Sequence, residues 1–221
     1  MYHYAHPHPA VTTDVVAFTI RKSMLNVLLI RRGNDPYRGC WALPGGFVDI
    51  DEDLEAGARR ELEEETGVTG LDLEQFHAFG RPDRDPRERV ISVAYYALVP
   101  PDNLRLHAAS DADDAGWFPI DALPGLAFDH AEIIAMAHQR LVAGFDRSTI
   151  ALRFLPDRFT LGELQSVHEA IRGQSLDRRN FRKWALTRGR IEATGELRHE
   201  GTHRPARLYR AVASARAGKI D

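Results

Sequence analysis

Four glutamates occupy five consecutive positions in the segment RRELEEETG, which runs from residue 59 to residue 67: Glu61, Glu63, Glu64 and Glu65. Carboxylates three or four residues apart on a helix repel each other, by roughly 0.2–0.5 kcal/mol per pair. A hard divalent cation would neutralise them, because Mg²⁺ binds carboxylate oxygens together with the phosphate oxygens of a substrate. The alternative is a solvated acidic helix end, which is the ordinary meaning of a run of glutamates.

The spacing of the glutamates favours the cation. At 100° per residue, Glu61 and Glu65 continue the apolar stripe that begins at Leu54. Carboxylates directed toward the protein body must be paired, protonated or bound to a cation. Arg60 lies four residues before Glu64 and can pair with it, which leaves Glu61 and Glu65 without an evident local partner. Several carboxylates in one place could hold two or more ions across a diphosphate.

The surrounding residues support the same interpretation. From Gly46 to Val68 the chain reads GFVDIDEDLEAGARRELEEETGV, which resembles the Nudix box GX5EX7REUXEEXGU, where U is an aliphatic residue. Every specified position agrees: Gly46, Glu52, Arg60, Glu61, Leu62, Glu64, Glu65, Gly67 and Val68. The resemblance implies the Nudix α/β/α sandwich, with a loop-helix-loop site for Mg²⁺ or Mn²⁺ and cleavage of a nucleoside diphosphate linked to another group.

The resemblance also implies roles for residues of the box. The metal ligands would be the carboxylates of Glu61, Glu64 and Glu65 with the carbonyl of Gly45. Glu52 and Arg60 would support the catalytic centre by tying the loop to the helix. A glycine at position 45 and another at position 46 fit this role, because their backbone can approach an ion closely.

Residues outside the box supply a base and ligand contacts. Asp111, Asp113 and Asp114, in a loop before Trp117, are candidates for the general base, with simple solvation as the alternative. Pro82 lies fifteen residues beyond Gly67, which resembles the ADP-ribose-cleaving branch of the superfamily. Candidates for stacking on adenine or holding phosphate or ribose are Phe79, Arg81, Arg84 and Arg87, which could equally be ordinary loop residues.

The elements that must position these residues form a mixed α+β pattern. β-branched, apolar-rich runs predict strands over 11–20, 26–32, 74–79, 89–99 and 116–120. Helices are predicted over 53–65, closed by Gly67, and over 129–144. Residues 41–47 read as a turn region. Strands with few helices between them, and none in strict β-α-β alternation, predict a sandwich.

Charge divides the chain into two parts. Residues 151–221 hold 15 basic and 8 acidic residues, a net charge of +7, while the first 150 hold 14 and 24, a net charge of −10. Two modules with different partners are therefore expected. A single cysteine, Cys40, excludes an internal disulfide framework and fits the reducing cytoplasm. No apolar run approaches the length of a membrane span, and the first residues do not resemble a signal peptide.

The basic part has the element order of a winged helix-turn-helix. Thr160 and Glu163 form a capping box that opens a helix over 161–172, ended by Gly173, and a second helix follows over 176–189. Residues 191–196 and 205–212 read as a two-stranded ribbon. The expected DNA contacts are Arg178, Arg179, Asn180, Arg182 and Lys183 of the second helix and Arg198, His199, His203, Arg204 and Arg207 of the wing. The alternative is a solvated helix in a dimerisation or packing domain.

Both parts together resemble the Nudix-related transcriptional regulators of NAD metabolism. The resemblance rests on the box, on residues 79–95 and 128–134, and on SLDRRNFRKW and GTHRPARLYR. It implies a homodimer that binds operator DNA and is regulated by ADP-ribose. Many members have lost box residues, whereas this box is intact, so hydrolysis of ADP-ribose is also expected. The alternative is a plain Nudix hydrolase with a C-terminal dimerisation domain. The expected division is a flexible tail (1–10), a Nudix domain (11–145), a linker (146–156), a winged domain (157–214) and a second tail (215–221).

Overall fold

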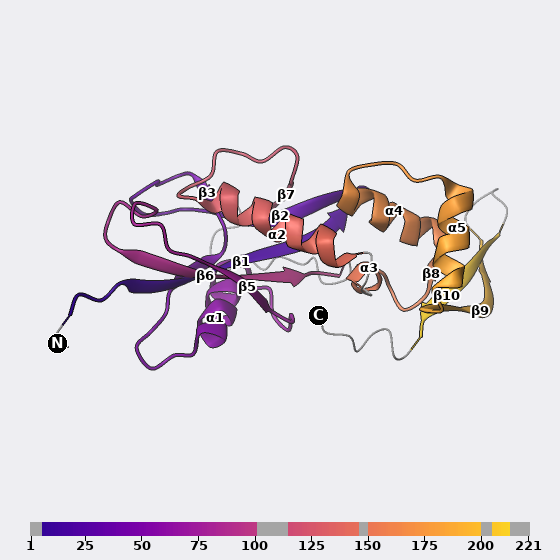
Figure 1. Cartoon of the computed structure of the whole chain (residues 1–221), viewed down its shortest axis with the longest axis horizontal. Helices are drawn as coiled ribbons and strands as arrows, with labels where there is room; N and C mark the ends of the chain where they lie inside the picture. Colours follow the sequence, from indigo (N-terminus) through magenta and orange to yellow (C-terminus); the bar gives the residue numbers. More distant parts are fainter. Residues whose placement is uncertain (1–5, 101–114, 146–149, 200–204, 213–221) are drawn as a thin grey trace. The chain divides into compact units, whose positions relative to one another are not determined.

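The structure is a computed structural model that describes residues 6–100, 115–145, 150–199 and 205–212 (Figure 1). The chain divides into two compact units. The first consists of Met1–Phe18, Asn26–Leu98 and Arg105–His138, and the second of Thr19–Leu25, Val99–Leu104 and Gln139–Asp221. Among the described residues, no helix is long and apolar enough to cross a membrane.

A mixed sheet dominates the N-terminal part. Its described strands are β1 (Ala10–Arg21), β2 (Met24–Arg31), β3 (Trp41–Ala42), β4 (Gly45–Phe47), β5 (Glu74–Phe79), β6 (Val90–Leu98) and β7 (Ala115–Pro119). The order is β3-β2-β1-β6-β5, with β4 paired to β1 and β7 paired to β2. Strands β1 and β6 are parallel, and both are buried over most of their length, including the polar residues Thr12, Thr13 and Asp14 of β1. The predicted strands are confirmed; β3 and β4 replace part of the predicted turn region.

Two helices accompany this sheet, and Figure 1 shows them on opposite sides of it. Helix α1 (Leu54–Thr66) begins at the N-cap Asp53 and ends at Gly67, whose φ of 69° is the left-handed conformation that glycine adopts easily. Helix α2 (His130–Phe145) buries Ile133, Ile134, Ala137 and Leu141. Both predicted helices and the α/β/α sandwich are therefore confirmed.

The C-terminal part has its own elements. They are α3 (Ile150–Arg153), β8 (Phe159–Thr160), α4 (Leu161–Arg172), α5 (Arg178–Thr187), β9 (Ile191–Arg198) and β10 (Ala206–Ala211), with the strands in the order β8-β10-β9. The capping box is present: the Thr160 side chain accepts from the Glu163 N–H, and the Glu163 carboxylate accepts from the Thr160 N–H. Helix, helix and ribbon follow one another as the sequence predicts.

The core of this part is apolar and uses the predicted helix faces. Leu164, Val167 and Ile171 of α4 are buried, and so are Phe181 and Ala185 of α5. The segment expected to be a linker contributes buried residues as well: Ile150, Ala151 and Leu152 of the short helix α3, and Phe154 and Leu155 after it. The exact domain boundaries stay a prediction.

Candidate functional site

Arg60 organises the acidic end of α1. Its Nε and one terminal nitrogen each donate to the Glu52 carboxylate at 2.9 Å. Its other terminal nitrogen donates to Glu61 at 2.8 Å and to Glu64 at 3.2 Å, and the carbonyl of Phe47 accepts a further bond. These bonds raise the pKa of Arg60, and the bond from Arg60 lowers the pKa of Glu52. The loop before α1 is thereby fastened to the helix.

The expectation that Glu61 lacks a local partner is wrong, because Arg60 donates to this neighbouring carboxylate at 2.8 Å. The partner of Glu65 lies far from it in sequence: the Gly45 N–H donates to Glu65 Oε2 at 2.9 Å. The reason is that a guanidinium carries five donors and can serve several carboxylates at once, which a pairwise i,i+4 count does not capture. The predicted pair of Arg60 with Glu64 is present.

Strand β4 brings its backbone against these carboxylates. A Cβ atom at Gly46 would clash with the Glu61 carboxylate, and one at Gly45 would clash with the carbonyl of Thr13. Gly45 also has a φ of 156°, which side chains rarely adopt. Both glycines are therefore required by close approach, and the pair lies directly beside Glu61 and Glu65.

Glu65 is the most perturbed carboxyl of the group. Burial raises its pKa to about 7, and the charges of Glu61 and Asp14 act in the same direction against the bond from the Gly45 N–H. A divalent cation would relieve this cost by favouring the charged form. The oxygen donors of Glu61, Glu65 and the Gly45 turn fit a hard ion such as Mg²⁺ or Mn²⁺.

The candidate metal ligands do not all face one point in this structure. Within the described residues, no three acidic, histidine or cysteine side chains already surround one point. Glu64 is the outlying member, because its side chain is 60% exposed and is held by Arg60 at 3.2 Å. An ion bound by Glu61, Glu64 and Glu65 would therefore compete with Arg60 for Glu64.

A cleft of about 140 Å³ begins at the same glycine pair. Its walls also carry three arginines, two aspartates, three aromatic rings and one threonine: Arg32, Arg84, Arg87, Asp14, Asp85, Phe47, Phe128, His130 and Thr12. Since a carboxylate-lined turn and an arginine-lined cleft adjoin each other, the geometry suits a ligand that carries phosphate.

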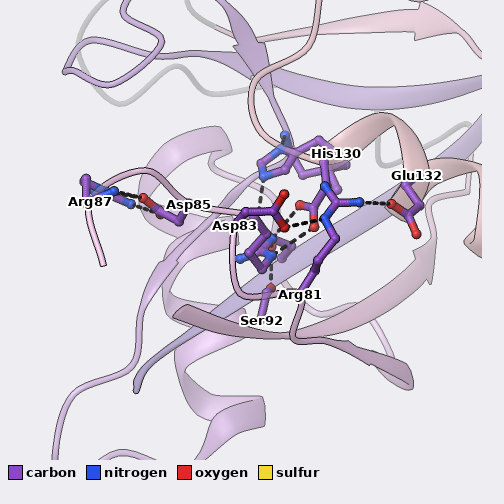
Figure 2. Close-up of polar contacts among 11 residues, drawn as sticks. Arg81, Asp83, Asp85, Arg87, Ser92, His130 and Glu132 are labelled. Atoms are coloured by element: carbon purple, nitrogen blue, oxygen red, sulfur yellow. Dashed lines mark hydrogen bonds and ion pairs between the residues drawn. The ribbon is translucent and has the colours of Figure 1, made fainter. Parts of the chain in front are cut away.

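Buried polar residues, some of which line this cleft, are joined in one network, and Figure 2 draws its hydrogen bonds and ion pairs. Arg84 donates to both oxygens of Asp129, at 2.7 and 3.0 Å, and its guanidinium lies 3.5 Å from Asp14. The Ser92 hydroxyl donates to Asp14. Arg84 therefore serves to fix two buried carboxylates, rather than offering its charge freely to a ligand.

His130, the first residue of α2, completes this network. Its Nδ1 accepts from the Leu43 N–H at 2.8 Å, and its Nε2 lies 3.5 Å from Asp14 Oδ1. Burial lowers the pKa of His130, so the ring is neutral at pH 7. With Nδ1 accepting, Nε2 carries the proton and faces Asp14, which fixes the carboxylate from a third side.

The ligand residues expected from sequence divide into two pairs. Arg84 and Arg87 line the cleft, whereas Arg81 and Phe79 do not. Arg81 is 58% exposed and pairs with Asp83 and Glu132, as Figure 2 shows. Phe79 is only 6% exposed, because β5 is irregular between Gln75 and His77 and then turns Phe79 inward. Its ring cannot stack on adenine in this cleft.

Sequence reasoning missed most of the cleft. Asp14, Arg32 and the pair Phe128 and His130 lie far apart in the chain. The segment 128–134 supported the family resemblance, but no role was assigned to its residues. The candidate bases Asp111 and Asp113, with Asp114, lie outside the described residues, so their role stays a prediction.

Helix α5 presents its basic residues to solvent. Arg178, Arg179, Asn180, Arg182 and Lys183 are all exposed. In the described part of the chain, none of the four basic residues forms an ion pair. Arg178 and Arg182 line a groove of about 600 Å³ together with Arg207 of β10, whereas Arg179 and Lys183 do not. Asn180 lines a second, smaller hollow beside Trp184.

The wing is only partly described. Arg207 is exposed on β10, whereas His203 and Arg204 lie outside the described residues. Arg198, expected to contact DNA, instead donates to the Glu163 carboxylate at 2.8 Å and to the carbonyl of Arg158. This pairing fastens the wing to the start of α4, and a contact of Arg198 with DNA stays a prediction.

Family models match both the N-terminal and the C-terminal part of the chain. A family model for the NUDIX domain matches residues 9–137, and one for the NrtR DNA-binding winged helix domain matches residues 151–211. The chain is 36% identical over 211 residues to the ADPR responsive transcriptional repressor NtrR of Acinetobacter baylyi, covering 93% of this chain and 83% of that protein. It is 42% identical over 127 residues to the ADP-ribose pyrophosphatase of Methanocaldococcus jannaschii, covering 58% and 72%.

Solved structures extend the similarity to three dimensions. The crystal structure of Shewanella oneidensis NrtR with a 27mer DNA matches with a TM-score of 0.78 at 36% identity, covering 91% of this chain and 93% of that one. The Nudix domain of the same protein, complexed with ADP ribose, matches with a TM-score of 0.54 at 36% identity, covering 62% and 91%.

Proposed function

This chain belongs to the Nudix family and carries an NrtR-type winged helix DNA-binding domain, and from that premise we propose that it is a transcriptional repressor whose Nudix domain responds to ADP-ribose. The observation that carries the proposal is the exposed basic face of α5 in the same chain as the cleft beside Gly45 and Gly46. The similarity to the Acinetobacter repressor, which spans both domains, supports it. A homodimer on operator DNA is part of the proposal.

We further propose that the Nudix domain hydrolyses ADP-ribose. When bound, a divalent ion would neutralise the diphosphate and activate a water for attack on phosphorus. Glu61 and Glu65 would hold it at the Gly45 turn with Glu64, and Arg60 would keep the loop in position through Glu52. The full set of box carboxylates and the 42% identity to an archaeal ADP-ribose pyrophosphatase support this part.

The fixed charges around the cleft suit a diphosphate sugar. Asp14 is held by Ser92, Arg84 and His130 and so keeps its orientation when a ligand enters. A prearranged polar wall of this kind lowers the cost of ordering side chains on binding.

A retardation assay with the protein's own upstream DNA tests the regulatory proposal. Wild type should retard that DNA at concentrations that leave unrelated DNA free. ADP-ribose, with Ca²⁺ to suppress hydrolysis, should release the DNA, whereas equal concentrations of ribose should not. Absence of specific retardation would leave the alternative of a Nudix hydrolase with a C-terminal dimerisation domain.

A further inference from the structure

Two arginines of the cleft are held against one aromatic ring. The guanidinium carbon of Arg32 lies 4.8 Å from the centroid of the Phe128 ring, and that of Arg87 lies 5.7 Å from it. Arg87 also lies 5.0 Å from the centroid of Phe47. Cations within about 6 Å of a ring face are attracted by its quadrupole. Phe128 therefore makes cation–π contacts with two guanidinium groups at once.

The backbone at Phe128 is unusual. Its φ of 52° lies in the left-handed region, which is uncommon for a bulky residue. Strained residues of this kind persist where the surroundings hold them, and they are frequent in binding sites. Here the edge of Tyr37 packs on the ring at 4.8 Å between centroids, and the next two residues, Asp129 and His130, are fixed in the buried network.

The two arginines differ in how their charge is balanced. Arg87 donates to both oxygens of Asp85, at 2.7 and 3.0 Å. Arg32 donates to backbone carbonyls only, those of Pro36 at 2.9 Å and Asn34 at 3.4 Å, and forms no ion pair with a carboxylate in the described part of the chain. Burial first, and then the neighbouring Arg87, lower the pKa of Arg32, while the charges of Glu65, Asp85 and Asp14 act in the opposite direction. An anion between the two guanidiniums would offset the burial of this charge and its repulsion from Arg87.

The other polar groups of the cleft are buried or already engaged. Thr12 lines the cleft, but its hydroxyl oxygen has almost no accessible surface, so it is assigned no contact with a ligand. The carboxylates that share the cleft, Asp14 and Asp85, are already engaged by Ser92 and Arg87.

The size of the cleft limits what it can hold. Its volume of about 140 Å³ is well below the roughly 300–1,000 Å³ of sites that enclose a whole small-molecule ligand. Only one end of a nucleoside diphosphate sugar fits, and the rest must lie outside.

We propose that Arg32 and Arg87, supported by Phe128, form a clamp for the phosphoryl group of a sugar phosphate. The cleft adjoins Glu61 and Glu65 at Gly45 and Gly46, but the clamp supplies positive charge of its own, so it binds its phosphate without a divalent ion. This inference rests on the proposed ligand class and specifies which chemical group the cleft recognises. The two ends of ADP-ribose share this group, since one resembles AMP and the other ribose 5-phosphate.

Isothermal titration calorimetry on the full-length protein in EDTA tests the clamp. The probes are ribose 5-phosphate and AMP, each compared with its unphosphorylated counterpart, ribose or adenosine, at fixed ionic strength. One phosphorylated probe should bind at least ~10-fold more tightly than its counterpart, because its phosphate gains charge-assisted hydrogen bonds. The probe that binds identifies the end of the ligand that enters the cleft.

Variants then assign the effect to the clamp. Arg32→Gln should weaken that probe at least ~10-fold, and Arg32→Lys by less, because lysine keeps the charge but loses the planar fork. Phe128→Leu should also weaken it, although both charges remain. The matched control is Arg81→Gln, an exposed arginine outside the cleft, which should bind as wild type does. Thermal unfolding tests whether each variant is folded. If Arg32→Gln is not folded, Arg32→Lys takes its place in the comparison with wild type.

Two results would overturn the clamp: no sugar phosphate binds in EDTA, or folded Arg32→Gln and Arg32→Lys bind it as wild type does. Release of operator DNA by ADP-ribose is measured separately, on wild type with Ca²⁺. If ADP-ribose releases DNA while the arginine variants bind sugar phosphate as wild type does, the clamp proposal is wrong and the regulatory proposal is supported. If sugar phosphate binding depends on Arg32 while DNA is never released, the clamp stands and the regulatory proposal fails.

Discussion

Helices α1 and α5 both carry many charged side chains, but the two helices differ in whether these side chains are paired. On α1, Arg59 pairs with Glu55, Arg60 pairs with Glu52, Glu61 and Glu64, and Glu65 accepts from the backbone of Gly45. On α5, Arg178, Arg179, Arg182 and Lys183 are exposed and form no ion pair within the described residues.

The difference indicates two kinds of ligand. Charges that are fixed by partners at the protein surface have little freedom, which suits a small anion or ion held in one geometry. Unpaired cations along one helix face suit a polyanion, whose affinity comes from many contacts and from the release of counterions. A Nudix domain and a DNA-binding domain in one chain meet these two descriptions.

The largest effect is expected at Glu65. Glu65→Gln should lower the rate of AMP formation from ADP-ribose with Mg²⁺ by at least ~10²-fold, because it removes a charged ligand beside the Gly45 turn. The matched control is Glu63→Gln on the same helix, whose exposed side chain lies outside the site and should leave the rate unchanged. If wild type makes no AMP at saturating metal, the enzymatic part of the proposal is wrong.

The pH dependence of metal binding is the next largest effect. The pKa of Glu65 is raised to about 7, so protons compete with the ion below that value. The affinity for Mn²⁺, measured by electron paramagnetic resonance, should fall by up to about tenfold for each pH unit below 7 and level off above it. Glu65→Gln should flatten this slope. An affinity in wild type that does not change between pH 5 and 8 would contradict the role of Glu65.

On α5, the residues outside the groove should read bases. Arg179→Ala should cost about 1–3 kcal/mol of operator binding and relax preference at one base pair. Binding to a panel of single-base operator variants measures this effect. The control is Arg210→Ala, since Arg210 of β10 is paired with Glu192 and should not contact DNA. Equal losses on every DNA sequence would argue against base reading by Arg179.

The arginines that line the groove should contact phosphates, and replacing them should have the smallest effect. Arg182→Ala should weaken all DNA sequences alike and reduce the slope of log affinity against log salt by about 1. Arg182 lines the groove with Arg207, and replacing Arg207 should have the same result. A loss of affinity for the operator alone, with an unchanged salt slope, would show that Arg182 reads bases and does not contact phosphates.

The parts of the fold that sequence predicted are those with local signals. Asp53 and Gly67 bound α1, and Thr160 with Glu163 opens α4, because caps and glycines act within a few residues. The short strands β3, β4 and β8 were missed, since two or three residues become a strand only by pairing with a distant partner.

The residues of the site also divide into those with a local sequence signal and those without one. Glu61, Glu64 and Glu65 could be predicted because one helix carries them at fixed spacing. Asp14 and His130 could not, because β1 and the start of α2 bring them within 3.5 Å across more than one hundred residues of sequence. The burial of Phe79 could not be predicted, because a strand irregularity changed the side that it faces.

The central claim is that one chain couples ligand binding to DNA binding, and linkage gives its most direct test. Operator affinity and ADP-ribose affinity should be measured on the same Glu65→Gln protein, each with and without a saturating concentration of the other ligand. We expect ADP-ribose to weaken operator binding by about 1–3 kcal/mol, and saturating operator to weaken ADP-ribose binding by the same amount. Equal ADP-ribose affinity for the free and the operator-bound protein would contradict the account, and would leave two independent domains on one chain.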